Sequence, residues 1–411
     1  MRAALTIAIA TLTLGLASGL TPALQVRDDV SPVESIRMID AEIGWAVTAR
    51  CGPCPPHRES GLMLRTASGG TDWKDVTPAD TSGRRIDVPY FHAFNSHIAW
   101  VSRVDPVGSM TTEIFHTING GRTWRSTVIP ARNVNSISFI NPREGWLIAF
   151  FDAGSGNENV DIYRSTDGGE SWIRVTSARD GGGESGLPYG DKSSIAFANP
   201  TTGWITGLGP KPDSLYLYVT RDGGRTWRQQ NLLVPPPPPR QQSQPLPSEV
   251  KPHWDARARP PKFFTATDGI MRVDYAHYLF NDSTGDEQNT GVVFVYYVTH
   301  DGGTTWAYTA SVPIGHIDDR RPSSFANMNH GWVKEEDTLY VTSDGGRRWT
   351  TIRPGALFAD VTWLDFVSPK VGWAVRNTDP YGGGAKQTSP FLLKTMDGGR
   401  TWTAVTYTVL P

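Results

Sequence analysis

The sequence predicts an all-β protein, a seven-bladed β-propeller of four-stranded antiparallel blades, and three observations support this. The pattern Ser/Thr-x-Asp-Gly-Gly-x-x-Trp recurs seven times along the 411 residues. Most copies follow a second element, a Phe-containing run that leads into a Gly-Trp run. The two elements together indicate four strands per unit, and copies are spaced about one propeller blade apart. The motif tryptophans are Trp73, Trp124, Trp172, Trp227, Trp306, Trp349 and Trp402.

The repeated motif is typical of a tight turn between two strands. Asp-Gly between extended runs favours a hairpin, because glycine adopts positive φ at little cost. The third motif position holds Asp, Asn or Ser, and each of these side chains can accept hydrogen bonds from backbone amides of the turn. We expect these residues to be structural and the following Trp to pack in the core. The third-position residues are Ser68, Asn119, Asp167, Asp222, Asp301, Asp344 and Asp397.

The second element indicates two further strands in each unit. Phe139 stands seven residues before Trp146, with a turn sequence between them. The same spacing recurs in Phe197–Trp204, Phe325–Trp332 and Phe366–Trp373. The fifth unit is degenerate and has Ile270 where Trp is expected. Of the 15 tryptophans, only Trp254 and Trp363 stand outside these positions, and Trp363 is expected in the core.

These motifs resemble those of Asp-box (BNR-repeat) propellers of the sialidase-like superfamily, over roughly residues 33–406. They are similar above all to the photosystem II stability/assembly-factor-like branch, which alternates an F-x6-W inner pair with a DGGxxW turn. The motifs are highly specific for fold and weakly specific for activity. Sialidase relatives imply an early Arg-Ile-Pro stretch, whereas the nearest string here is Arg84-Arg85-Ile86 followed by Asp87. No catalytic residue is therefore carried over.

The first 23 residues predict a secretory signal peptide. Arg2 precedes an apolar stretch, and small residues follow it, so cleavage after Gly19 or Ala23 would fit. We expect an exported protein in the periplasm, outside the cell or in a lumen, with no membrane span after the leader. The propeller then covers 33–411. The formal net charge is −2, with no basic block suited to nucleic acid or anionic lipid.

A proline-rich insertion is predicted at 234–262, between blades four and five. Its first part, "VPPPPPRQQSQPLP", favours extended polyproline or disorder. The stray Trp254 then stands beside Arg257 and Arg259, a composition typical of interaction hot spots. The alternative is that this loop folds back and Trp254 caps the propeller edge. Arg320 and Arg321 are weaker candidates for partner binding, because Asp318 and Asp319 precede them.

The chain has two cysteines, Cys51 and Cys54, in the sequence "CGPC". A thioredoxin-like site needs the first thiol at a helix N-terminus, but strands are predicted on both sides. A zinc site with His57 would lack one ligand. A structural disulfide therefore fits an exported protein best.

The sequence favours a monomeric, non-catalytic scaffold or assembly-factor-like module that binds a protein partner on its loop-rich face. No cofactor or metal is expected. The alternative is a glycosidase-like enzyme or a glycan-binding propeller, because acidic loops such as 151–161, 281–289 and 334–338 could supply paired carboxylates. An enzyme should show paired carboxylates, one with a raised pKa, whereas a scaffold should show a broad face with Trp, Tyr and Arg.

Overall fold

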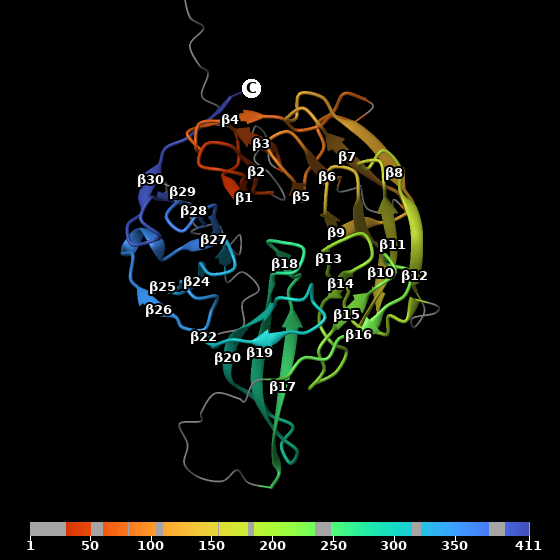
Figure 1. The fold of residues 1–411 in the computed structure, drawn as a ribbon, viewed down its shortest axis with the longest axis vertical. Coiled ribbons are helices and arrows are strands. Elements are labelled where there is room, and N and C mark those ends of the chain that lie inside the picture. Colours follow the sequence, from red (N-terminus) through yellow and green to blue (C-terminus); the bar gives the residue numbers. More distant parts are fainter. Residues whose placement is uncertain are drawn as a thin grey trace, which may run out of the picture.

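The computed structural model describes residues 30–50, 61–80, 82–103, 110–154, 156–179, 185–234, 248–314, 322–377 and 391–410. Seven β-sheets surround a central axis, so the predicted seven-bladed propeller is confirmed (Figure 1). The described helical structure includes a short 3-10 turn, η2 (Ala356–Phe358). In the ranges given above, no helix is long and apolar enough to span a membrane.

The basic blade contains four consecutive antiparallel strands, with the first nearest the axis, and blades one and five carry additional strands. Blade one holds β1 (Val33–Met38), β2 (Gly44–Thr48), β3 (Met63–Thr66) and β4 (Asp72–Asp75). Blade two holds β5 (Tyr90–Ala93), β6 (Ala99–Ser102), β7 (Thr112–Thr117) and β8 (Arg125–Ile129). Blade three holds β9 (Asn133–Phe139), β10 (Gly145–Gly154), β11 (Asn157–Ser165) and β12 (Ile173–Ala178). Blade four holds β13 (Ser194–Phe197), β14 (Gly203–Thr206), β15 (Leu217–Thr220) and β16 (Arg228–Gln229).

The last three blades follow the same order, with additions in blade five. Blade five holds β17 (Val250–Ala258), β18 (Lys262–Phe263), β19 (Gly269–Asn281), β20 (Glu287–Thr299), β21 (Ala307–Tyr308) and β22 (Val312–Ile314). Blade six holds β23 (Ser323–Phe325), β24 (Gly331–Glu335), β25 (Thr338–Thr342) and β26 (Thr350–Ile352). Blade seven holds β27 (Val361–Phe366), β28 (Gly372–Arg376), β29 (Leu392–Thr395) and β30 (Thr403–Val405).

Two blades depart from the four-strand plan. The last strand, β31 (Thr408–Leu410), pairs in parallel with β4 and adds a fifth strand to blade one. In blade five, β17 and β18 both pair with β19, and β21 and β22 both pair with β20. Part of the predicted insertion 234–262 therefore forms the inner strands of blade five.

The Phe and Gly-Trp positions of the sequence motif face each other across the first two strands of a blade. Phe139 pairs with Gly145, which precedes Trp146. A Cβ atom at Gly145 would lie 2.6 Å from atoms of the Phe139 ring, so this glycine makes room for the ring. Blade two keeps the fit with two small residues, because Ala93 pairs with Ala99.

Aromatic side chains join several neighbouring blades in a repeated arrangement. Trp100 of blade two stacks on Phe139 of blade three at 3.5 Å between ring centroids, and Trp172 meets the same Phe edge-on. The Trp100 indole N–H also donates to the Gly168 carbonyl, at 2.7 Å. The same stack forms in Trp146–Phe197 and Trp332–Phe366. This arrangement explains why the motif combines Phe, Gly-Trp and a second Trp.

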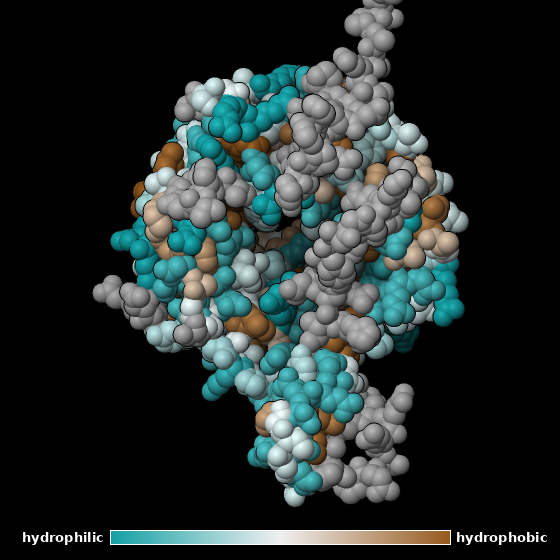
Figure 2. All heavy atoms as spheres, turned by 180° about the vertical axis from the view of Figure 1, so that it is seen from behind, coloured by the Kyte–Doolittle hydropathy of each residue, from teal (hydrophilic) through white to brown (hydrophobic). Residues whose placement is uncertain are grey.

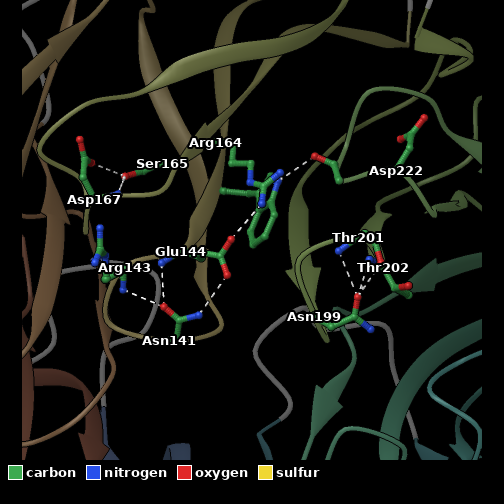
Figure 3. Close-up of polar contacts among 12 residues, drawn as sticks. Asn141, Arg143, Glu144, Arg164, Ser165, Asp167, Asn199, Thr201, Thr202 and Asp222 are labelled. Atoms are coloured by element: carbon green, nitrogen blue, oxygen red, sulfur yellow. Dashed lines mark hydrogen bonds and ion pairs between the residues drawn. The ribbon is translucent and has the colours of Figure 1, made fainter.

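The motif turns are closed by side-chain hydrogen bonds to the backbone. In blade four, the Thr220 hydroxyl accepts the Gly224 N–H at 2.9 Å and donates to Asp222 at 2.8 Å. Asp222 accepts the Thr226 N–H at 3.0 Å. Ser165 and Asp167 do the same in blade three, close to the turn around Asn141 (Figure 3).

Candidate binding surfaces

The turns between first and second strands and the turns between third and fourth strands lie on one side of the ring. The other connections therefore lie on the opposite side. The Gly168 N–H donates to the Arg143 carbonyl at 2.8 Å, and the Gly223 N–H donates to Thr201 in blade four at 2.9 Å. The turns between first and second strands therefore contact those between third and fourth strands. The remaining connections, such as 185–193 and 207–216, end on the other side, which we call the loop face.

A buried lysine organises the loop face between blades three and four. The Lys192 side chain is 1% exposed, and its Nζ donates to Asn157 Oδ1 at 2.9 Å and to the Glu158 and Gly190 carbonyls at 3.0 and 2.9 Å. These bonds hold the tip of the β10–β11 hairpin against the segment that leads into β13. Burial lowers the pKa of Lys192 to about 8.

Glu158 and Asp191 bring two carboxyl groups together beside this lysine. Burial raises the pKa of Glu158, and the negative charge of Asp191 raises it further, whereas the Lys192 backbone N–H and the charge of Arg257 lower it. The Lys192 N–H donates to Glu158 Oε2 at 2.6 Å. A carboxyl group whose pKa is raised by burial and by a second carboxyl group nearby is a candidate general acid. The loop 151–161, which contains Glu158, was proposed from the sequence as a source of carboxylates. Asp191 was missed, because only the fold brings its segment beside this hairpin.

An arm of blade five extends beyond the edge of the ring (Figure 1). It consists of β17 and the outer halves of β19 and β20, whose register runs from Trp254 opposite His277 to Val250 opposite Asn281. His253 stacks on Tyr278 at 5.3 Å between centroids.

Trp254 lies where this arm leaves the ring. Its ring is half-buried and meets Tyr275 edge-on at 5.4 Å. Its backbone is tied to blade four, because the Asp213 N–H donates to the Trp254 carbonyl at 2.8 Å and the Trp254 N–H donates to Asp213 Oδ1 at 3.0 Å. Trp254 therefore packs at the junction of two blades, and its role in partner binding stays a prediction.

The other predicted partner-binding residues have different surroundings. Arg259 pairs with Asp274 at 2.8 Å, and Arg272 pairs with the same carboxylate. Arg257 forms a β-bridge with Leu208 of blade four and is half-buried. The structure thus brings Trp254, Arg257 and Arg259 to one strand or its end. Arg320, Arg321, Cys51 and Cys54 lie outside the described residues, as does 235–247 of the proline-rich segment.

The fold and these surfaces define a β-propeller with one elaborated face and a lateral arm. No family model matches the chain. The xyloglucanase Xgh74A of Acetivibrio thermocellus is 22% identical over 327 residues, which cover 65% of this chain and 34% of that enzyme. The chain thus spans about a third of the length of this curated relative.

Solved structures of similar fold include YCF48 bound to a D1 peptide and an ancestral GH74 enzyme. The YCF48 structure has a TM-score of 0.45 and 13% identity, and the match covers 92% of this chain and 99% of that chain. For the GH74 enzyme the TM-score is 0.35 at 12% identity, and the match covers 92% of this chain and 62% of that chain.

Proposed function

We propose that this chain is an exported, non-catalytic, monomeric Asp-box propeller that binds a protein partner, in the manner of an assembly or stability factor. The observation that carries the proposal is the blade five arm. It extends a paired sheet away from the ring and presents charged and aromatic side chains beside the loop face. The signal peptide that the sequence predicts at 1–23 supports export.

The composition of the arm supports protein binding. Lys251 is exposed, and Leu279 and Phe280 are half-buried on the outer half of β19. Residues 287–290 of β20 are exposed, and on one side they pair with β19. On the other side they lie beyond the stretch that pairs with β22, so this edge of β20 is unpaired among the described residues. Apolar groups among charges next to a free strand edge are suited to a polypeptide partner.

Two other buried carboxylates are held in ion pairs and are therefore poorer candidates for catalysis. Asp161 is fully buried and pairs with Arg179 at 2.6 Å. Asp75 pairs with Arg85 at 2.7 Å. Such charge-assisted contacts tie these carboxylates to the fold.

The test is cross-linking and recovery of partners from the native cell envelope with a shortened arm. Tyr278 pairs with Asn289, so residues 279–288 can be replaced by Asn-Gly, which suits a two-residue hairpin. This variant keeps the inner strands of blade five, and Arg125→Ala, which removes an exposed cation on blade two, is the control. We expect one envelope protein to be recovered with wild type and control and lost with the short arm. Equal recovery with the short arm would place the site elsewhere, and recovery of no protein would refute the scaffold.

A second candidate function is glycoside hydrolysis at Glu158 and Asp191, which the raised pKa of Glu158 beside Asp191 favours. The similarity to a xyloglucanase suggests xyloglucan as the first substrate to assay. Release of reducing ends by the wild type, and its loss in Glu158→Gln and Asp191→Asn, would support the enzyme. Equal release by all three proteins would exclude this pair.

A further inference from the structure

The outer part of β20 has one strand edge that no described strand covers. On one side, residues 287–290 follow the pairing of β20 with β19. On the other side, β22 reaches only to Val292 of β20, and β21 reaches only to Tyr297. Within the described ranges, residues 287–290 therefore form an open edge, which we call the arm edge.

The hydrogen bonds of the hairpin indicate which backbone groups face the arm edge. The Asn281 N–H donates to the Asp286 carbonyl at 2.8 Å, so the carbonyl of Asp286 points toward β19. In an antiparallel strand, successive residues turn their N–H and C=O groups to opposite sides. Glu287 and Asn289 therefore turn these groups toward the arm edge, whereas Gln288 turns them toward β19. The arm edge thus offers two donors and two acceptors to an added strand.

The arm carries a large excess of negative charge. Its residues 248–255 and 277–291 hold five carboxylates and one lysine, a formal charge of −4 with histidine neutral, whereas the whole chain carries −2. Four of the five carboxylates are exposed, and Figure 2 shows hydrophilic side chains over much of the projecting arm. The five are Glu249, Asp255, Asp282, Asp286 and Glu287.

The basic side chains of the arm lie on β17, away from the arm edge. Lys251 pairs with Asp282 of the hairpin turn. His253 reaches across β19, and its Nε2 lies 2.9 Å from Glu287 Oε1. The Glu287 side chain is still 50% exposed, and Asp286 beside it is exposed as well. The arm edge therefore presents carboxylates to solvent, and its own four residues include no cation.

The charge of the arm edge restricts which strands can be added there. Charged side chains on an edge strand commonly prevent pairing with another copy of the same chain. Two arm edges side by side would bring like charges together, which is unfavourable. A strand of opposite charge would instead gain cross-strand ion pairs, because a residue directly opposite Glu287 lies on the same face of the sheet as this carboxylate.

We propose that the arm edge binds an extended, cationic segment of a partner protein, which adds a strand to blade five beside β20. This inference rests on the proposed function, because it names the chemistry of the partner and the part of the arm that it meets. A Lys or Arg of the segment lies opposite Glu287 and near Asp286, and its backbone bonds to that of Glu287. The residues between these cations turn their backbone groups away from β20 and need no charge.

Fluorescence anisotropy of labelled peptides with the full chain tests the inference. The probe is the peptide Lys-Val-Lys-Thr-Lys-Val-Lys, and the comparison peptide has Glu in place of each Lys. We expect the Lys peptide to bind at least about tenfold more tightly than the Glu peptide, and its affinity to fall as salt is added.

Methylation of peptide amides separates strand addition from charge attraction alone. One form of the Lys peptide carries N-methyl groups on the lysine amides, which face β20 in the proposed complex, and a matched form carries them on the Val and Thr amides. The first should bind about tenfold more weakly than the unmethylated peptide, because its amides can no longer donate to the arm edge. The second should bind as the unmethylated peptide does.

Reversal of one charge gives a readout that an unfolded protein cannot mimic. In Glu287→Lys, the ratio of the two peptide affinities should shift by about tenfold toward the Glu peptide. Glu42→Lys reverses an exposed carboxylate in the turn between β1 and β2, and this matched control should change nothing. The inference is overturned if the Lys peptide does not bind, if both methylated forms bind alike, or if Glu287→Lys keeps the preference of the wild type.

Recovery of partners from the cell envelope distinguishes this inference from the proposed function. Loss of the envelope protein with both the short arm and Glu287→Lys would support both. Loss with the short arm but retention with Glu287→Lys would overturn the arm edge as the binding site and leave the protein-binding role in place. Binding of the Lys peptide without recovery of any envelope protein would support the arm edge and refute the assembly role.

Discussion

Replacing Gly145 by alanine should destabilise the propeller, and the structure gives the size of the effect. The new Cβ would lie 2.6 Å from atoms of the Phe139 ring, well inside ordinary contact distance. That ring cannot retreat, because Trp100 stacks on one side at 3.5 Å and Trp172 meets it edge-on. Overpacking of this kind costs about 1–3 kcal/mol. Lower entropy of the unfolded chain offsets about 0.4–1 kcal/mol, so we expect a net loss of about 1–2 kcal/mol.

The same strand supplies a matched control. Gly154 ends β10, and a Cβ there would meet no atom within 4 Å. Neither glycine has a positive φ, so backbone strain does not distinguish them. Gly154→Ala should leave stability unchanged or raise it by up to about 1 kcal/mol. With Phe139→Ala in the background, Gly145→Ala should also become neutral, as blade two already combines two alanines at the equivalent pair.

Urea unfolding followed by tryptophan fluorescence measures these differences. The free energies of the four proteins of the Phe139 and Gly145 cycle give a coupling energy, which we expect to be about 1–2 kcal/mol. If Gly145→Ala and Gly154→Ala behave alike, or if the cycle is additive, the account of the Gly-Trp motif is wrong.

Three further predictions concern other parts of the fold. Hydrogen bonds from Thr305 hold the pKa of Asp301 at about 2, below its unfolded value of about 4, so its contribution to stability is present above pH 4 and lost as the pH falls toward 2. Between pH 4 and pH 2, the free energy of unfolding should therefore fall less for Asp301→Ala than for the wild type, as measured by acid unfolding. Lys192→Met leaves buried acceptors without a donor and should lower the free energy of unfolding by about 1–3 kcal/mol, measured in urea. Removal of 406–410 takes away β31 and should lower the melting temperature in a calorimetric scan, whereas an unchanged melting temperature would show that β31 contributes nothing.

The repeat made the fold predictable in detail. Seven turn motifs and their paired Phe and Trp positions correctly predicted blade number and strand order, and even the degenerate fifth unit has Phe263 in register with Gly269. β17 was not predicted, because it includes Pro252 and lacks a clear alternation of apolar and polar residues. β31 was missed because it belongs to no repeat unit.

The candidate sites were much less predictable. Trp254 was proposed for partner binding because it lies outside the repeat. Its packing on Tyr275 could not be predicted, because it depends on contacts that only the fold reveals. Trp363 was expected in the core, but it is 42% exposed, because its indole N–H donates to a backbone carbonyl of β1 at 2.9 Å and holds the ring at the inner surface. Glu158 lies near the start of strand β11, and Asp191 lies in the segment that leads into β13, so only the fold brings them near each other.

The parallel strand β31 joins parts of the chain that are far apart in sequence. Thr408 bonds to Asp72 across 336 residues, and the Trp373 indole bonds to Gly69 across 304. Contacts of such long range close a very large loop and are slow to form. During synthesis, the outer edge of blade one therefore stays uncovered until β31 has been made. The seam between blades seven and one is accordingly the place where the ring should close last in folding and open first when it is pulled apart.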